Sequence, residues 1–212
     1  MKTKDTVQSY IAGQIKELHL LNFMCHKNFS IQFYPTHMQL VTGSNGSGKS
    51  TIANAICLCL GAQARTTGRT SNVQSFIRKG ETLAQIMITL ANEGPEAYKP
   101  ELYGKDIQII RKISLQQSGY TILDANRRII SGRKDTIDQI MQALSISPEN
   151  PLCVLHQDIA KIFLIHTDSK KKYQFYMKVS QLDQIKQAYE QSICTVQLLT
   201  QRVNVMKQVT MK

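Results

Sequence analysis

Gly43-Ser-Asn-Gly-Ser-Gly-Lys-Ser50, followed by Thr51, is the stretch that decides the fold of this chain. It fits the phosphate-binding pattern G-x-x-x-x-G-K-[ST] at every fixed position. Three glycines give the backbone left-handed freedom, so that its amides can approach an anion closely. The Lys49 ammonium can reach phosphate oxygens, and the Ser50 hydroxyl can bind Mg²⁺. The pattern therefore predicts a site for a nucleoside triphosphate and its magnesium ion.

The residues on either side support this interpretation. His37–Thr42 can form a short buried strand that runs into the loop, and residues 52–60 can form the helix that leaves it, with Gly61 as its stop. A strand, a glycine-rich loop and a helix are the context that the motif requires. The alternative is a glycine-rich turn that matches the pattern by chance, and these flanks argue against it.

The composition limits the classes of function. The chain has 212 residues, of which 42% are hydrophobic, enough for a sizeable core. It carries 26 Lys and Arg against 15 Asp and Glu, a net charge of +11. Such a balance favours a polyanionic partner, most simply nucleic acid, although basic residues can also serve only solubility. No secretion signal and no membrane span is visible, which leaves the cytosol or the nucleus.

The five cysteines do not have the spacing of a zinc site. No pair is separated as in C-x-x-C, and Cys57 and Cys59 fall inside the apolar helix after the loop. We expect buried thiols rather than disulfides or metal ligands.

Hydrophobic patterns divide the rest of the chain. Residues 1–12 are predicted to be a loose leader, and residues 62–75 a polar surface loop. Strands are predicted before and after the loop, and Pro148 and Pro151 end a helix with apolar residues at helical spacing. The predicted hairpin pairs 15–23 with 29–33 across 22–28; the later strands are 84–91, 107–113, 120–123 and 128–130; the helix is 135–144.

The tail changes character and carries a seven-residue repeat. One core position holds Leu182, Tyr189, Val196 and Val203, and the other holds Ile185, Ser192, Leu199 and Met206. About four heptads without proline or glycine predict a coiled coil. The alternative is a single amphipathic helix that packs on the domain itself.

Part of an ATPase is missing from the sequence. Hydrolysis needs an acidic residue at the end of an apolar strand, and a group that positions water. The nearest match is Ile122-Leu-Asp124, which we interpret as a chance match because Ala125 follows and the segment lies in the meander. No Ser-Gly-Gly signature occurs. The layout is that of the N-terminal half of an ATPase, interrupted where a long helix begins.

This layout resembles the SMC (structural maintenance of chromosomes) family. In that family an N-terminal half-head carries the phosphate loop, a coiled coil leads away, and a C-terminal half-head supplies the acidic strand and the signature. The resemblance runs from about residue 15 to about residue 185 and is nearest to the sixth eukaryotic subunit. It rests on Asn22-Phe-Met-Cys-His26, Leu60-Gly-Ala62, Phe76-Ile-Arg-Lys-Gly80, Ala97-Tyr-Lys-Pro100, Asn150-Pro151 and Phe175-Tyr-Met-Lys178.

The resemblance implies a fold and three segments. The fold is an α/β phosphate-loop NTPase half-head of the ABC/SMC type, with a mixed sheet and an antiparallel β meander, followed by a long coiled-coil helix. The segments are a flexible leader (1–12), the half-head (13–178) and the start of the coiled-coil arm (179–212).

It also implies site residues. Gln157 is similar to the family's Q-loop glutamine, which positions water or Mg²⁺, and Arg69 lies where an arginine could stabilise phosphate charge. Residues 22–27 are expected near the nucleotide base. The residues expected to bind ATP and Mg²⁺ are Gly43, Ser44, Asn45, Gly46, Ser47, Gly48, Lys49, Ser50 and Thr51.

The implied partners are a C-terminal half-head, a second SMC subunit (the fifth paralogue) and DNA bound without regard to sequence, in the nucleus on chromosomes. Candidate phosphate contacts on DNA are Arg78, Lys79, Arg127, Arg128, Arg133 and Lys134. Two alternatives stay open: a truncated, non-enzymatic interaction module, and another ATPase of the same broad class, such as a different SMC-like repair protein or a transporter subunit.

Overall fold

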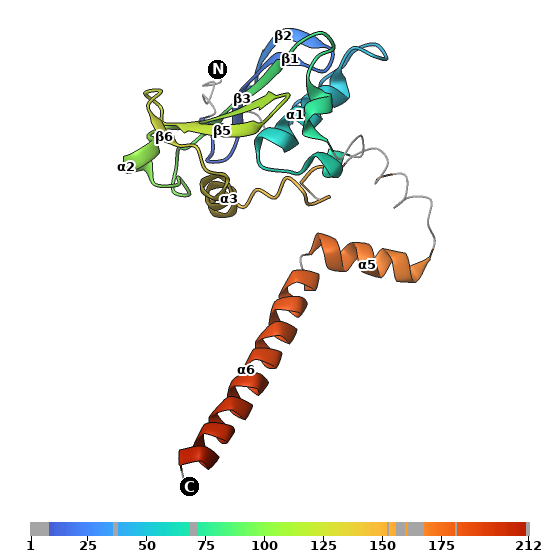
Figure 1. The fold of residues 1–212 in the computed structure, drawn as a ribbon. Helices are drawn as coiled ribbons and strands as arrows, with labels where there is room; N and C mark the ends of the chain where they lie inside the picture. Colours follow the sequence, from blue (N-terminus) through green and yellow to red (C-terminus); the bar gives the residue numbers. More distant parts are fainter. Residues whose placement is uncertain are drawn as a thin grey trace, which may run out of the picture. The chain divides into compact units, whose positions relative to one another are not determined.

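The computed structural model describes residues 9–35, 38–67, 72–151, 153–155, 160, 168–180 and 182–210. The chain divides into two compact units, Met1–Glu149 and Asn150–Lys212. The first unit holds a β-sheet with its helices, and the second holds, among its described residues, the helices α5 and α6 (Figure 1). None of the helices within the described ranges is long and apolar enough to cross a membrane.

A six-stranded sheet is the frame of the first unit (Figure 1). Its order is β2-β1-β3-β4-β5-β6, and every pair of neighbours is antiparallel. Only β1 and β3 are neighbours in space without being consecutive, because the glycine-rich loop and its helix are inserted between β2 and β3. The strands are β1 (Ile15–Phe23), β2 (His26–Gln32), β3 (Leu83–Ala91), β4 (Asp106–Ser114), β5 (Ser118–Leu123) and β6 (Ile129–Ser131).

The predicted hairpin and meander are confirmed. The hairpin closes more tightly than predicted, since β2 begins at His26 and pairs it with Phe23. Met24 in the turn takes a φ of 51°, a left-handed value that allows the short connection. The predicted helix over 135–144 is α3 (Lys134–Ala143).

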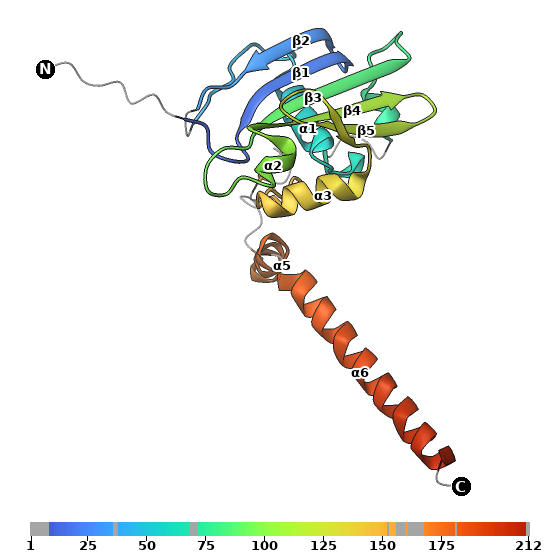
Figure 2. The same cartoon turned by 90° about the vertical axis from the view of Figure 1, so that its left-hand side faces the viewer.

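One face of the sheet carries the core. Alternate residues on β1, β3 and β4 point to this face, for example Leu18, Ile88 and Ile109, each fully buried. The helix α1 (Lys49–Cys59) and α3 supply the other side of the same apolar cluster (Figure 2). The short elements η1 (Ala64–Thr67), η2 (Val73–Phe76) and α2 (Pro100–Tyr103) complete the unit. In the segment predicted as a surface loop, 62–75, the described residues are only partly exposed, because Ala62 and Ala64 are buried.

The strand predicted over His37–Thr42 is wrong for the described part of that segment. Residues 38–42 form no strand, and Met38 and Leu40 are 87% and 86% exposed. A strand needs a neighbour to take up its backbone N–H and C=O groups, and none of the six strands pairs with this segment. The predicted mixed sheet depends on that strand, and the sheet among the described residues is antiparallel throughout.

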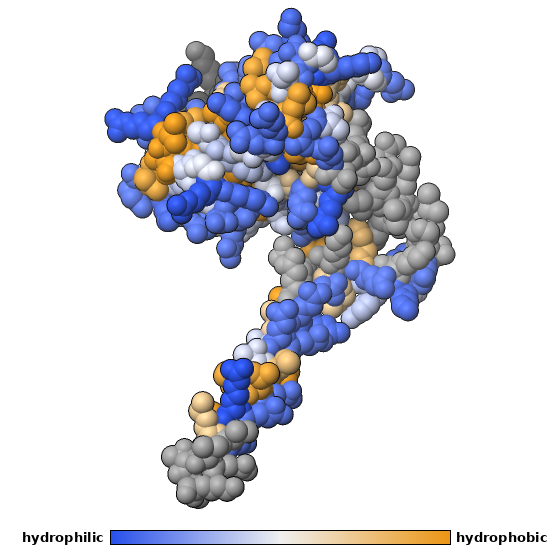
Figure 3. Space-filling model, in the orientation of Figure 1, coloured by the Kyte–Doolittle hydropathy of each residue, from blue (hydrophilic) through white to orange (hydrophobic). Residues whose placement is uncertain are grey.

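The described part of the second unit includes α5 (Ser169–Val179) and α6 (Leu182–Thr210). The apolar register positions of α6 are exposed, among them Tyr189 at 67% and Val196 at 61%. Figure 3 shows these apolar side chains at the surface of the helix, between polar ones. The coiled coil, and the three predicted segment boundaries, stay predictions.

Candidate nucleotide-binding site

The glycine-rich loop joins the irregular segment 38–42 to the first turn of α1. Gly46 and Gly48 take φ values of 82° and 94°, which side chains with a Cβ rarely adopt. The left-handed backbone at Gly48 is also the N-cap of α1, so the chain turns directly from the loop into the helix. Two of the three glycines predicted to take a left-handed backbone therefore do so, and Gly43 does not.

Free backbone amides gather at this turn. The Ser47 amide donates to the Ser44 carbonyl at 3.3 Å, and the Thr51 amide donates to the Gly48 carbonyl at 2.9 Å. Among the described residues, the amides of Gly46, Gly48, Lys49 and Ser50 have no acceptor. These donors lie at a helix N-terminus, where the helix dipole also favours negative charge. A phosphate group is the kind of ligand that such a turn can bind.

The Lys49 side chain folds back over the loop. Its ammonium donates to the carbonyl oxygens of Gly43 and Ser44 at 2.6 and 2.7 Å. The structure therefore brings Lys49 to the loop that it was predicted to serve. The acceptors that hold the ammonium over the loop are therefore two neutral carbonyl oxygens and not a carboxylate.

The two hydroxyls at the start of α1 have different surroundings. Ser50 is exposed, whereas Thr51 is 3% exposed and its hydroxyl lies 3.7 Å from the Cys25 thiol. Ser50 is thus accessible to a metal ion, and Thr51 packs toward the hairpin.

The hairpin turn lies directly against the loop. A Cβ placed on Gly48 would clash with His26 Nε2 and would lie only 2.8 Å from Cys25 Sγ. Within the described part of the chain, the buried His26 Nε2 atom has no hydrogen-bond partner, and the ring packs on Phe29 at 4.7 Å between centroids. Residues 22–27 were predicted to lie near the nucleotide base, and the structure places two of them against the phosphate loop. In the sequence, only Gly48 indicates this contact, because a side chain at this position would clash with the hairpin turn.

The far end of α1 is fixed by a second set of contacts. The Ala62 amide donates to Cys57 and the Gly61 amide to Leu58, which closes the helix with a left-handed glycine as predicted. The buried Arg111 guanidinium donates to the carbonyls of Leu58 and Ala62. A cation at this end complements the helix dipole.

Arg111 also stacks on the Tyr120 ring, 4.9 Å from its centroid. The Tyr120 hydroxyl donates to the Leu58 carbonyl at 3.2 Å, and burial raises the pKa of this tyrosine to about 12. Arg111 falls among the core-facing positions of β4, with Ile109 and Ile113, but no local pattern in the sequence indicates Tyr120 as its partner. The pair anchors α1, and with it the loop, to the sheet.

The helix cysteines Cys57 and Cys59 are buried, as predicted. Burial raises the pKa of Cys57 to about 11 and that of Cys59 to about 12. The Cys59 thiol donates to the Ile109 carbonyl at 3.4 Å and packs α1 against the sheet. Cys25, Cys153 and Cys194 are exposed and free. Within the described ranges, no three His, Cys, Asp or Glu residues gather into a metal-binding group.

The two residues predicted to have catalytic roles, Gln157 and Arg69, lie outside the described residues. Asp124, interpreted as a chance match to an acidic strand end, serves the β5–β6 turn. Its carboxylate accepts from the amides of Asn126 and Arg128 at 2.9 and 2.7 Å. This turn accounts for the carboxylate without any role in catalysis.

The basic residues predicted to contact DNA are separated on the first unit. Arg78 and Lys79 lie near the hairpin turn, where Arg78 donates to the Cys25 carbonyl. Arg127 and Arg128 follow β5 at the opposite end of the strands, and both are exposed. Arg133 and Lys134 are exposed at the start of α3. The structure does not bring the six into one cluster.

Comparisons with known proteins assign the chain to a family. A family model described as an AAA domain matches residues 17–209. The chain belongs to this AAA domain family. Within it, the chain is the N-terminal half of an SMC-type ATPase head. A solved structure from work on ATP-driven dimerization and DNA-stimulated activation of SMC ATPases covers 78% of this half-head and 98% of its own chain, with a TM-score of 0.64 and 26% identity. An Smc head bound to the C-winged helix domain of ScpA covers 72% of the half-head and 47% of its own chain, with a TM-score of 0.55 and 27% identity.

Curated relatives give the same family. Structural maintenance of chromosomes protein 6 of Schizosaccharomyces pombe is 42% identical over 185 residues, which is 85% of this half-head. The protein of the same name in Homo sapiens is 37% identical over 185 residues, which is 87% of it. The half-head spans only 16% and 17% of the length of these two relatives. The fold class predicted from the sequence, a phosphate-loop SMC-type half-head, is confirmed.

Proposed function

We propose that this half-head binds ATP and Mg²⁺ as part of a DNA-associated SMC ATPase that acts in chromosome maintenance, DNA repair and recombination. The observation that carries the proposal is the phosphate loop: four amides without an acceptor among the described residues, at the N-terminus of α1, beside the Lys49 ammonium. The relatives named for chromosome maintenance support the biological role.

The residues of the loop divide the work of binding. The amides of Gly46, Gly48, Lys49 and Ser50 would donate to β- and γ-phosphate oxygens, in line with the helix dipole. Lys49 would exchange the carbonyls of Gly43 and Ser44 for phosphate oxygens, since an ammonium bonds more strongly to a charged acceptor. The exposed Ser50 hydroxyl would take one coordination position of Mg²⁺, which neutralises phosphate charge when bound. Ser44, Asn45, Ser47 and Thr51 complete the expected nucleotide contacts, with Gln157 and Arg69 as further proposed groups.

The half-head needs a second half. Met38, Leu40 and Val41 are exposed immediately before the loop, where a neighbouring strand would cover them. Asp124 is engaged in its turn, so the acid that holds the metal must come from elsewhere. We propose that a C-terminal half-head supplies this acid and the adjacent strand, and that a second SMC subunit, the fifth paralogue, closes over the nucleotide.

The partner polyanion is proposed to be DNA in the nucleus, on chromosomes. A net charge of +11 favours contact with phosphates, which carries no sequence information. Because the candidate basic residues are spread over the first unit, each should contribute separately to a salt-dependent affinity. Replacing Arg127 and Arg128 by Gln should reduce the salt slope of DNA binding by about two.

Turnover by the completed head tests the proposal. The half-head, its C-terminal half and the partner head are combined, and Mg²⁺-dependent ATP hydrolysis is measured. Lys49→Ala and Ser50→Ala should each lower the rate at least tenfold, because each removes a contact to the phosphate or its metal. Hydrolysis that is unaffected by both variants would refute the assignment of the site.

A second candidate is a non-enzymatic interaction module. The exposed apolar positions of α6 favour it, because they can pair with another helix without any nucleotide. The turnover measurement separates the two: hydrolysis abolished by Lys49→Ala argues against the module, and ATP binding without turnover in the complete assembly argues for it.

A further inference from the structure

A pocket lies on the face of the sheet that is turned away from α1. Its volume is about 300 Å³, and it lies between the N-terminal segment and the end of β2. The phosphate loop is not part of its lining. The lining consists of Tyr10, Lys16, Glu17, Gln32, Phe33, Tyr34, Thr89, Asp106 and Gln108.

Three residues in register form a polar row across this face. Glu17 on β1 is opposite Thr89 on β3, and Thr89 is opposite Gln108 on β4. Thr89 is 6% exposed, and its hydroxyl has no hydrogen-bond partner among the residues that the structure describes. A buried hydroxyl without a partner is unfavourable and accounts for only a few groups in a folded protein. Such an atom in a pocket lining indicates a polar ligand.

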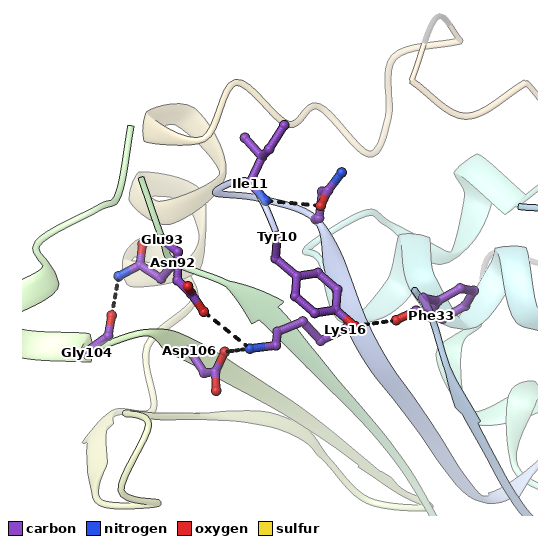
Figure 4. Close-up of polar contacts among 9 residues, drawn as sticks. Tyr10, Ile11, Lys16, Phe33, Asn92, Glu93, Gly104 and Asp106 are labelled. Carbon is purple, nitrogen blue, oxygen red and sulfur yellow. Dashed lines mark hydrogen bonds and ion pairs between the residues drawn. The ribbon is translucent and has the colours of Figure 1, made fainter. Parts of the chain in front are cut away.

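The other side of the pocket is held together by its own interactions (Figure 4). The Tyr10 hydroxyl donates to the Phe33 carbonyl at 2.6 Å, which ties the N-terminal segment to the residue after β2. The Lys16 ammonium lies 4.9 Å from the centre of the Tyr10 ring and bonds to Asp106 at 2.6 Å and Glu93 at 3.6 Å. Lys16 is therefore fully engaged with two carboxylates.

The electrostatics of the pocket are opposite to those of the chain. The lining carries one ammonium, on Lys16, and two carboxylates, on Glu17 and Asp106, and a third carboxylate, on Glu93, lies 3.6 Å from the same ammonium. Burial alone would lower the pKa of Lys16, but the hydrogen bond and charge of Asp106, with Glu93, raise it. The Glu17 carboxylate makes no hydrogen bond or ion pair with the described part of the chain. A local excess of negative charge in a chain of net charge +11 selects a cation and disfavours phosphate.

We propose that this pocket binds the side chain of an arginine carried by a polypeptide partner. A guanidinium presents several donors in one plane, so it can bond to the Glu17 carboxylate and to the Thr89 hydroxyl at the same time. The tyrosine rings of the lining offer faces on which the cation can stack. The volume lies at the lower end of that of ligand pockets and suits one side chain, not a nucleotide.

The position at the end of β2 favours a polypeptide as the carrier. β2 is an edge strand of the sheet and, among the described residues, pairs with β1 alone. Gln32, Phe33 and Tyr34, at the end of this edge, contribute to the lining. An extended peptide can add its backbone to such an edge while one side chain enters an adjacent pocket.

The test uses the whole chain and a capped Gly-Arg-Gly tripeptide, with a capped Gly-citrulline-Gly tripeptide as the neutral match. Binding is measured by calorimetry and by the NMR shifts of the Glu17, Thr89 and Gln108 amides, without nucleotide. The arginine peptide should shift these three amides and bind at least tenfold more tightly than the citrulline peptide. Glu17→Gln and Thr89→Val should each weaken it, by about tenfold and several-fold. Thr89→Ser, which keeps the hydroxyl, should preserve binding. As a control, Glu190→Gln removes an exposed carboxylate on α6 and should leave the binding of the arginine peptide unchanged.

Several results would overturn the proposal. Equal binding of the citrulline peptide, or unchanged binding of the arginine peptide by Glu17→Gln, would show that the pocket does not recognise a cation. Shifts that avoid all three amides would move the site elsewhere. Capped arginine alone, if it bound as tightly as the tripeptide, would contradict a polypeptide carrier.

Discussion

The sheet of the first unit and residues 38–42, which lead into the phosphate loop, differ in how completely this chain buries their side chains and pairs their backbone. Ile88, in the sheet, is fully buried and lies on a strand that is paired on both sides. Leu40, in the segment 38–42 before the phosphate loop, is 86% exposed and pairs with none of the six strands. The comparison teaches that the meander is paired and buried by this chain itself, whereas the described residues before the phosphate loop are neither.

Shortening a buried side chain should give the largest effect on stability, and it should distinguish the sheet from the segment 38–42. Ile88→Ala leaves a cavity between β3 and α1, so we expect a loss of about 2–5 kcal/mol in the free energy of unfolding. Leu40→Ala, the matched change in the exposed segment, should stay within about 0.5 kcal/mol. Urea denaturation of both variants measures the difference. Similar losses for the two would show that the loop segment is as well packed as the sheet.

Supplying the C-terminal half should remove the difference. If a strand of that half pairs with residues 38–42, their amides should become at least about 100-fold more protected against hydrogen exchange, because opening then requires breaking the new ladder. The amides of β3 are protected in both states and serve as the control. No gain of protection at 38–42 in the completed head would contradict the proposed pairing.

Gly46 and Gly48 allow a similar comparison of two positions within the phosphate loop. Both need a left-handed backbone, but only at Gly48 would an added Cβ collide with a neighbour, the His26 ring. Gly48→Ala should cost about 1–2 kcal/mol and weaken nucleotide binding, and Gly46→Ala should cost about 1 kcal/mol from backbone strain alone. Thermal unfolding with and without ATP measures both. Adding His26→Ala to Gly48→Ala should recover part of the loss; no recovery would rule out the clash as its cause.

The smallest effect is the dependence on pH of the interface between α1 and the sheet. Burial raises the pKa of Cys59 from 9.0 to about 12, so the folded state keeps a proton that the unfolded state loses. Stability from this thiol is therefore fully present below pH 9 and is lost as pH rises from about 9 toward 12. Between pH 8 and pH 10 the wild type should lose about 1 kcal/mol more than Cys59→Ala. Cys194→Ala, an exposed thiol, should leave the pH dependence unchanged, and equal pH dependence in all three would contradict the account.

Local patterns predicted most of the meander. The alternation in 84–91 and 107–113 is visible in the sequence because each strand has one buried and one open face. Gly61 predicted the end of α1, since a left-handed residue is needed there. In the loop, the glycine spacing predicted the left-handed backbone at Gly46 and Gly48 and the turn into α1, and the nucleotide contacts stay a prediction.

What the sequence could not predict depends on long-range contacts. The apolar run before the loop reads as a buried strand, but whether a strand forms depends on a neighbour that no local pattern shows. Arg111 occupies a core-facing position of β4 because the carbonyls at the end of α1 need donors there, a requirement set across 53 and 49 residues of chain. The polar row of Glu17, Thr89 and Gln108 exists only through the registers of three strands.

Calorimetry of ATP binding to the completed head tests the central claim most directly. With Mg²⁺ present, the wild-type half-head joined to its C-terminal half should bind ATP, and Lys49→Ala should weaken the affinity at least tenfold, because a charged contact to the phosphates is lost. Lys186→Ala, which removes an exposed charge of α6, should bind as the wild type does. Uptake of ATP by Lys49→Ala with unchanged affinity would contradict a phosphate site at the start of α1.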